Sequence, residues 1–334
     1  MRSGAGAAPT TWVAGAGGLI GQHVVRAARR RGPVIDGTPI PWPDPAAARE
    51  ALTTAAGRLV DGAGRRGWRM LWCAGTGVAG ATAARLEAEV AAFGATLDAL
   101  ADAGGRGGPG TVFLSSSIGG IHAGVGCPPY DETSPVAPIT DYGWAKHAME
   151  ERLRAWTRAA HGRAVIGRIA NVYGPGQSLD KPQGLISQVC AAQLDHRPVS
   201  IWASLDTLRD YVFAADAADL ALDAMERLGD DPEAGDGGTV VKVIGSLRPI
   251  TVGAVLGELR RVLKRQPTIV LAAPPLGAVQ VRDLSTRSVV WPDLDARAMT
   301  PFPAGVHATL TDLRSRQARA STDLHRPTAR GSAS

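Results

Sequence analysis

The sequence predicts an α/β fold in which parallel strands alternate with helices, and three observations carry this prediction. A β-prone run at residues 10–14 leads into a glycine-rich turn and then a helical stretch at residues 22–31. Strand-like runs at residues 68–75, 111–114 and 164–170 are separated by helix-like segments. With 334 residues, the chain is long enough for one large domain or two coupled domains.

Composition indicates a soluble globular protein with a large core, since 45% of the residues are hydrophobic. The formal net charge is +5, and residues 314–334 hold five arginines against one aspartate. The rest of the chain is therefore nearly neutral, which argues against a nucleic-acid partner. That terminal segment is polar and lacks apolar periodicity, so we expect a disordered tail at residues 314–334.

Several absences in the sequence favour a cytoplasmic protein. No apolar, uncharged run reaches 18 residues, so no membrane contact through a spanning helix is expected. The N-terminus lacks the apolar stretch of a signal peptide. The cysteines Cys73, Cys127 and Cys190 lie far apart without histidines at ligand spacing. We expect free thiols in a reducing compartment and no metal site.

The first strand is followed by glycines at the spacing G-x-x-G-x-x-G, namely Gly15, Gly18 and Gly21, which enclose Leu19 and Ile20. Glycines permit a tight turn and let the backbone approach a pyrophosphate at a helix N-terminus. This context of strand, turn and helix predicts a dinucleotide-binding site formed by these five residues.

A second strand is expected at residues 34–40, where an acidic residue at the strand end would hold the adenosine ribose. Asp36 lies 15 residues after Gly21 but in mid-strand. It is either the ribose ligand or a bulge or turn residue, so the choice between NAD and NADP stays open. Between Pro39 and Trp68 there is room for one helix and no convincing extra strand.

That helix is predicted at residues 45–61, before the buried strand at residues 68–75. The strand ends in the small residues Ala74 and Gly75, which would let a cofactor pass close. Residues 81–103 then form a long helix with one apolar face, typical of a core helix or a helix–helix interface.

Three consecutive serines, Ser115, Ser116 and Ser117, follow the strand at residues 111–114. The carboxyl ends of parallel strands border the ligand crevice of such folds. We therefore expect a serine hydroxyl at the site, in preference to a polar strand end or a helix cap.

Tyr142 and Lys146 are four residues apart, and residues at this spacing on a helix share a face. An ammonium beside a phenol favours the phenolate, which makes the tyrosine usable for proton transfer to or from a substrate hydroxyl. Taken alone, this spacing is also typical of an exposed helix face carrying an aromatic residue and a charge.

The glycine turn, the serine strand end and the Y-x-x-x-K pattern occur in the order and spacing of the extended short-chain dehydrogenase/reductase family. The chain resembles the NAD-dependent sugar-nucleotide epimerase/dehydratase branch of that family over about residues 10–313. Four further segments support the resemblance: Asp131–Pro135, Arg168–Gln177, Arg209–Val212 with Asp216, and Arg282–Asp283.

The resemblance implies a Rossmann-type doubly wound parallel sheet with a smaller C-terminal substrate-binding domain. The dinucleotide-binding domain would comprise residues 9–173 and about 209–246, and the substrate-binding domain residues 174–208 and 247–313. It also implies NAD as the cofactor, with NADP not excluded, a nucleotide-sugar substrate, and a homodimer.

The same resemblance assigns roles to individual residues. Tyr142 would be the acid/base, and Lys146 would bind the nicotinamide ribose and favour the phenolate. Ser117 would hydrogen-bond the reacting sugar hydroxyl, with Ser116 as the fallback, and Ser115 would border the cofactor.

Asn171, Arg209 and Arg282 would bind the pyrophosphate of the nucleotide, in keeping with the match between a guanidinium and phosphate oxygens. Asn171 is the sole asparagine of the chain and is alternatively a turn residue. Arg209 is alternatively part of a surface ion pair with Asp206 or Asp210.

The chain departs from the family pattern in two places. The family has Val-Tyr-Gly after the serines, where this chain has Ile121-His122-Ala123-Gly124. His122 either replaces that tyrosine in the sugar pocket or packs in the interior. The third strand of the family is also deleted from the pattern of this chain.

The residues after Ser117 bear on the reaction. Dehydratases resembling this chain add an acid pair there, whereas Ile118 and Gly119 cannot move a proton. The sequence therefore predicts an epimerase that oxidises a sugar hydroxyl to a ketone and re-reduces it. An NADPH-dependent ketoreductase and a non-catalytic dinucleotide-binding protein are the alternatives.

Overall fold

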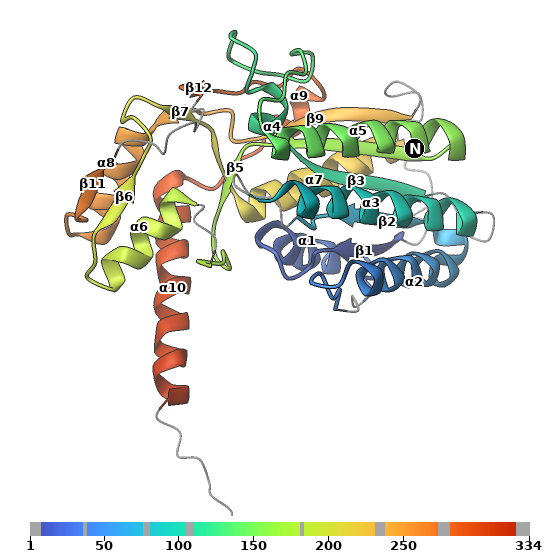
Figure 1. The fold of residues 1–334 in the computed structure, drawn as a ribbon, viewed down its shortest axis with the longest axis horizontal. Coiled ribbons are helices and arrows are strands. Elements are labelled where there is room, and N and C mark those ends of the chain that lie inside the picture. The colour runs from blue at the N-terminus through green and yellow to red at the C-terminus, as the bar shows by residue number, and fades with distance from the viewer. Residues whose placement is uncertain are drawn as a thin grey trace, which may run out of the picture.

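The computed structural model describes the chain in seven ranges, residues 8–35, 39–75, 81–104, 110–180, 184–230, 238–272 and 281–324. Its centre is a parallel five-stranded sheet with the order β1-β2-β3-β4-β9 (Figure 1). These strands are Thr10–Ala14, Trp68–Trp72, Gly110–Ser117, Arg163–Ile169 and Thr239–Ile244. Their residues are mostly buried, because helices cover both faces of the sheet.

Helices on the two faces produce the doubly wound arrangement that was predicted. One face is covered by α2 (Pro45–Ala63), α3 (Ala83–Gly104) and α5 (Asp141–Ala160), which share a core with the strands. The other face is covered by α1 (Leu19–Arg29) and α7 (Ala214–Asp230). The sheet thus places the carboxyl ends of its strands at one edge, where ligands bind in folds of this type.

The predicted strand at residues 34–40 is much reduced. Among the described residues there, only Val34 makes a bridge, in parallel with Thr11 of β1. Asp36, the predicted ribose ligand, lies outside the described residues. The chain then enters α2, whose first turn is capped by Asp44. No strand occurs in the described residues between Val34 and β2, which confirms the expected single helix.

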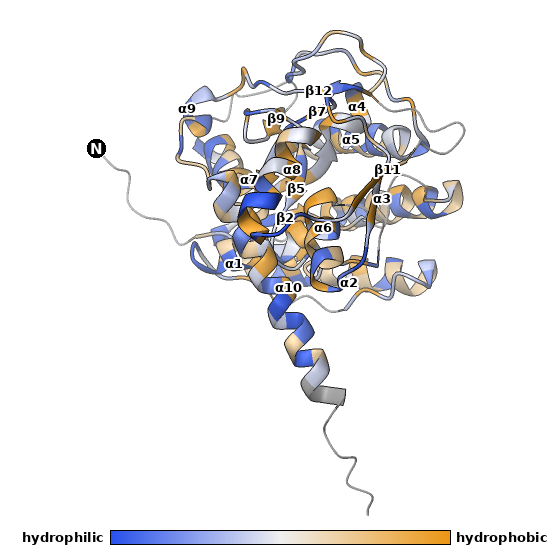
Figure 2. Ribbon diagram, turned by 90° about the vertical axis from the view of Figure 1, so that its left-hand side faces the viewer, coloured by the Kyte–Doolittle hydropathy of each residue, from blue (hydrophilic) through white to orange (hydrophobic). Residues whose placement is uncertain are grey.

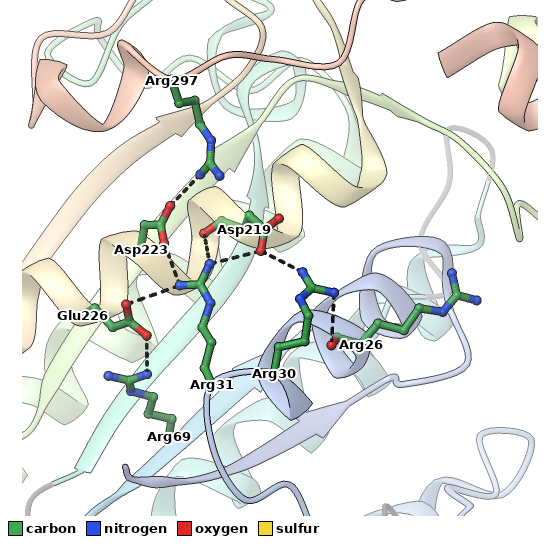
Figure 3. Close-up of polar contacts among 8 residues, drawn as sticks. All are labelled: Arg26, Arg30, Arg31, Arg69, Asp219, Asp223, Glu226 and Arg297. Atoms are coloured by element: carbon green, nitrogen blue, oxygen red, sulfur yellow. Dashed lines mark hydrogen bonds and ion pairs between the residues drawn. The ribbon is translucent and has the colours of Figure 1, made fainter. Parts of the chain in front are cut away.

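A network of ion pairs joins α1 to α7 across one face of the sheet (Figure 3). Arg31, just after α1, contacts Asp223 at 2.6 Å and Asp219 at 3.0 Å. Arg297 also pairs with Asp223, so the segment after α9 (Pro292–Asp295) is attached to the same helix. The network therefore ties C-terminal residues to the part of the fold that contains the five-stranded sheet.

A smaller unit lies beside the sheet, at the left of Figure 1. Its core is formed by α6 (Leu185–Leu194), α8 (Val252–Leu263) and the first half of α10 (Phe302–Leu324). Short strands complete it: β6 (Val199–Ile201) pairs with β11 (Ile269–Leu271), and β7 (Leu208–Arg209) lies between β10 (Ile250–Thr251) and β12 (Asp283–Leu284). The predicted domain boundaries stay a prediction.

Helix α10 contradicts part of the prediction that residues 314–334 form a disordered tail. Its first half is anchored by the buried residues Val306, Leu310 and Leu313, and its second half projects from the molecule as a hydrophilic helix (Figure 2). The tail predicted to be disordered from residue 314 is therefore helical as far as Leu324. Arg316 contributes, because it pairs with Asp312 one turn earlier at 2.8 Å.

Three further short elements are α4 (Ile118–His122), β5 (Asn171–Tyr173) and β8 (Tyr211–Phe213). Strand β5 pairs in parallel with β8. None of the helices in the described ranges combines the length and apolar character needed to span a membrane.

Candidate active site

Close packing excludes side chains at two positions of the glycine turn after β1, Gly15 and Gly21. Gly15 has φ of +84°, and a Cβ there would lie 2.5 Å from the Cα of Ala74. A Cβ on Gly21 would lie 2.1 Å from the carbonyl oxygen of Gly15. The turn itself is closed by the Gly18 amide, which donates to the Gly15 carbonyl at 3.0 Å.

This turn fits the predicted dinucleotide. Gly18 is the N-cap of α1 and provides no side-chain cap, and a Cβ on the neighbouring Gly17 would meet nothing within 4 Å. Leu19 and Ile20 form the first turn of α1. Their end of the helix is therefore open to an anion, and pyrophosphate is the group such a helix start accommodates.

The end of β2 connects this turn to the predicted acid/base pair. Ala74 is buried against the glycine turn, and a Cβ on Gly75 would lie 3.7 Å from Nζ of Lys146. Small residues at 74 and 75 thus keep the end of β2 close to both the turn and the lysine. This is the edge of the sheet at which ligands bind in folds of this type.

Tyr142 lies in the first turn of α5, where Thr140 caps the helix by accepting from the Gly143 amide at 3.1 Å. The next turn brings Nζ of Lys146 to 5.8 Å from the centre of the tyrosine ring. The two predicted residues therefore share one face, as their spacing indicates.

Ser117 and Tyr142 meet across Gly120. A Cβ on that glycine would lie 3.2 Å from Cε1 of Tyr142 and 3.4 Å from Oγ of Ser117. Ser117 also caps α4, since its hydroxyl oxygen accepts from the Gly120 amide at 3.1 Å. The structure thus brings the predicted serine, tyrosine and lysine together at the end of β3.

Ser116 is turned away from this group. Its hydroxyl donates to Oε1 of Glu150 at 2.6 Å, and Glu150 forms a buried ion pair with Arg168 at 2.8 Å. Ser115 is 8% exposed. Because Ser116 is held in the interior, Ser117 is the serine that borders the site.

Lys146 has a partner that sequence reasoning missed. Its ammonium contacts Oε1 of Glu89 in α3 at 3.2 Å, and both side chains are 6% exposed. Burial disfavours the ammonium, but the charges of Glu89, Tyr142 and Cys73, together with the hydrogen bond to Glu89, outweigh burial and raise the pKa of Lys146. A signal was available, because Glu89 lies three residues after Leu86 and four before Phe93, on the apolar face of the helix.

His122 packs in the interior, which corrects its placement among the substrate-binding residues. It is fully buried and stacks on Tyr130, with ring centres 5.6 Å apart. Its Nδ1 lies 2.7 Å from the carbonyl oxygen of Pro135, and its Nε2 lies 3.2 Å from the Arg168 guanidinium. Burial lowers the pKa of His122, consistent with a neutral ring that donates to Pro135 and accepts from Arg168.

The three predicted phosphate ligands lie on or next to short strands: Asn171 in β5, Arg209 in β7, and Arg282 just before β12. The backbone N–H of Asn171 donates to the carbonyl oxygen of Asp210 at 3.0 Å. The backbone N–H of Leu208 donates to the carbonyl oxygen of Arg282 at 2.9 Å. The Asn171 side chain is exposed. A Cβ on Gly119 would lie 3.1 Å from Cδ1 of Leu284, so β12 borders α4.

The two arginines have different partners. The Arg209 guanidinium donates to the carbonyl oxygens of Leu208 at 2.7 Å and Val281 at 2.8 Å, and burial lowers its pKa. Arg282 is 77% exposed on its side chain and pairs with Asp206. The ion pair considered for Arg209 is thus formed by Arg282.

The segment after Tyr130 is anchored by Asp131, which makes a testable contribution to stability. Burial opposes ionisation, but hydrogen bonds from Thr133 and the Arg287 guanidinium lower the pKa of Asp131 to about 2. A lowered pKa stabilises the fold above pH ~4 and loses this contribution as the pH falls toward 2. We expect Asp131→Asn to remove about 2 kcal/mol of unfolding free energy at pH 7.

The measurement is urea unfolding of both proteins between pH 7 and pH 3. The difference between them should shrink as the pH falls. A difference that is constant with pH would show that the charge of Asp131 contributes nothing.

The comparison with protein-family models identifies the class of protein. The NAD dependent epimerase/dehydratase family matches residues 11–238. The chain belongs to this family, and its cofactor is NAD, as predicted.

Individual relatives agree with this assignment. The chain is 29% identical over 116 residues to a dTDP-4-dehydro-6-deoxyglucose reductase of Escherichia coli, covering 35% of this chain and 37% of that protein. It is 34% identical over 105 residues to a dTDP-L-rhamnose 4-epimerase of Burkholderia thailandensis, covering 31% of this chain and 28% of the relative. These matches span only about a third of each relative.

The fold is shared over almost the whole chain. A UDP-glucose 4-epimerase from Thermotoga maritima, solved with UDP-glucose, superposes with a TM-score of 0.74 at 21% identity. The match covers 92% of this chain and 99% of that structure.

Proposed function

We propose that this protein is an NAD-dependent epimerase of a nucleotide-linked sugar that works through a transient keto-sugar. One observation carries the choice of reaction: Ser117 is followed by Ile118 and Gly119, at the positions where a dehydratase needs an acid and a base. Ile118 is 2% exposed, and Gly119 packs against Leu284. Neither position moves a proton, so the site supports oxidation and reduction but not loss of water.

Each catalytic residue then has a defined task. Ser117 hydrogen-bonds the reacting hydroxyl, and Tyr142 takes its proton as the carbon is oxidised and returns it on reduction. The Lys146 ammonium favours the phenolate through its charge and holds the cofactor ribose. When bound, NAD supplies the hydride acceptor and donor that these two half-reactions require.

Substrate binding would rest on the strands beside α4. Asn171, Arg209 and Arg282 are proposed to bind the pyrophosphate, because an exposed amide and two guanidinium groups supply donors for its oxygens. Arg282 is exposed and would exchange its partner Asp206 for phosphate. We also propose a homodimer formed through α3 and α5.

A keto-sugar reductase is the second candidate, favoured by the reductase from Escherichia coli among the relatives. Both reactions use Ser117, Tyr142 and Lys146, so the cofactor stoichiometry decides between them. The purified protein should be assayed with UDP- and dTDP-linked hexoses, with and without added NAD, NADH and NADPH.

An epimerase converts substrate without net consumption of cofactor and releases NAD when denatured. Consumption of one NADPH for each product formed would identify the reductase instead.

A further inference from the structure

A buried carboxylate, that of Asp210, lies between β7 and β8, and none of the proposed steps uses it. Asp210 is 1% exposed. Its Oδ1 accepts from the backbone N–H of Ser246 at 3.0 Å and from the Ser246 hydroxyl. Its Oδ2 accepts from the backbone N–H of Leu247 at 3.0 Å and from the Thr286 hydroxyl. One carboxylate therefore joins the turn after β9 to the segment after β12.

The backbone of Asp210 is joined to the proposed phosphate ligands. Asp210 directly follows Arg209, and its carbonyl oxygen accepts from the backbone N–H of Asn171 at 3.0 Å. Thr286, which donates to its side chain, lies in the segment that begins with Arg282 and contains β12. Each of the three residues proposed to bind pyrophosphate thus lies in a segment that contacts or contains Asp210.

We propose that Asp210 is a positioning residue for the nucleoside-diphosphate end of the substrate. It holds together the segments that carry the three proposed pyrophosphate ligands, Asn171, Arg209 and Arg282, and does not contact the phosphates itself. The inference rests on the proposed function, because it takes these three side chains as the pyrophosphate ligands.

The strands involved are too short to hold one another in place. Strand β5 has three residues, and β7 and β12 have two each. Strand β7 pairs with β12, whereas β5 pairs with β8, so Asp210 is the residue at which the two pairs meet. Packing at this point is close, since a Cβ on Gly245 would lie 2.3 Å from Oδ2 of Asp210. Side-chain hydrogen bonds to Asp210 therefore supply what short ladders lack.

A fixed spacing of these segments matters for binding an anion. Donors that must be ordered when the ligand arrives cost conformational entropy, and this cost lowers affinity. The Asn171 side chain is exposed, and that of Arg282 is 77% exposed, so neither is held by burial. Their backbones are instead fixed through the buried carboxylate of Asp210. The glycine turn proposed for the cofactor follows β1, so Asp210 should affect the substrate and not NAD.

The first test is Asp210→Asn, which keeps the shape and turns one oxygen into a donor. Whichever oxygen is replaced, one backbone N–H of the turn after β9 loses its acceptor. Binding of UDP and of dTDP is measured by calorimetry on the full chain with NAD present. We expect the Kd of the nucleotide that the wild type binds more tightly to rise about tenfold, as when one charged hydrogen bond to phosphate is weakened.

Turnover separates this role from a catalytic one. With the UDP- or dTDP-linked hexose that the wild type converts, KM should rise by a similar factor, while kcat changes by less than about threefold. The amount of NAD released on denaturation should match that of the wild type.

Thr286→Val is the second test, because it removes one donor, keeps the size of the side chain and leaves the charge of Asp210 in place. It should raise the same Kd by a smaller factor, about threefold. If Asp210→Asn does not fold, this variant decides the question.

Asp216→Asn is the matched control. Asp216 in α7 also accepts from a backbone N–H and a hydroxyl, both of Thr300, at 2.7 Å and 3.0 Å. It attaches a different C-terminal segment, so its replacement should leave the nucleotide Kd unchanged.

Unchanged or tighter nucleotide binding in Asp210→Asn and Thr286→Val would overturn the inference. Parallel losses of nucleotide and NAD binding would also overturn it, because they would show that Asp210 only maintains the fold. Both results leave the proposed function intact. A wild-type protein that retains NAD but binds neither UDP nor dTDP would instead contradict the proposed function, and the inference with it.

Discussion

Replacing Tyr142 with phenylalanine is expected to lower turnover by about 10²- to 10⁴-fold, the usual contribution of a general acid/base. The phenol is the group that meets Ser117 across Gly120 and lies beside the Lys146 ammonium. Phenylalanine keeps the ring and removes only the hydroxyl, so the glycine turn and the strands proposed to bind the nucleotide are untouched. Turnover should therefore collapse while nucleotide binding, measured by calorimetry, stays within a few-fold of wild type.

Tyr173→Phe is a suitable control because it makes the same chemical change in the core of the smaller unit. Among the described residues, the one hydrogen-bond contact of the Tyr173 hydroxyl is a long one of 3.5 Å to the carbonyl oxygen of Phe302, so turnover should be retained. If Tyr142→Phe were as active as Tyr173→Phe, the acid/base assignment would be wrong, and a non-catalytic dinucleotide-binding role would become the better interpretation.

Most of the sheet could be predicted from the sequence, because its strands are short apolar runs bounded by glycines and serines. The glycine turn shows why such local signals succeed: close approach of Gly15 to Ala74 requires glycine, and only glycine satisfies it. The strand expected around Val34 was overestimated, because a β-prone composition does not reveal whether a neighbouring strand is present to pair with it. In the described residues, pairing there is limited to Val34 and Thr11.

The end of the chain was misjudged for a different reason. Residues after Leu313 lack apolar periodicity, which indicates that they are not packed but does not exclude a helix. Residues 314–324 extend a helix that the buried half of α10 has already nucleated, so no further nucleation is needed for them to be helical. A solvent-exposed extension of an existing helix is therefore easily mistaken for disorder.

Around the site, the residues that belong to sequence motifs were predicted, whereas the buried residues that form ion pairs and hydrogen bonds with their surroundings were not. Tyr142 and Lys146 are linked by helix geometry, which spacing reveals. Glu89 and Glu150 reach their partners through the tertiary fold, and spacing says nothing about such contacts. His122 illustrates the point, since its interior position depends on Arg168, 46 residues away.

The second large effect is expected at Arg168, whose replacement by methionine should destabilise the fold by about 3–5 kcal/mol. Arg168 and Glu150 are 3% and 1% exposed on their side chains. Without the guanidinium, Glu150 would be a buried carboxylate. Among the described residues, the Ser116 hydroxyl would then be its one remaining close donor. The measurement is the free energy of unfolding from urea titration at pH 7.

The double variant Arg168→Met with Glu150→Met separates the two possible causes. Removing both charges leaves no unpaired carboxylate, so most of the lost stability should return. Arg261→Met tests the effect of burial, because Arg261 pairs with Glu258 at 3.0 Å but is 77% exposed, and its loss should cost less than about 0.5 kcal/mol.

Equal losses for Arg168→Met and Arg261→Met would contradict this account. The ion pair also matters for the site, because Glu150, whose charge Arg168 neutralises, holds Ser116 in the interior. The buried ion pair thereby fixes the strand end from which Ser117 faces Tyr142.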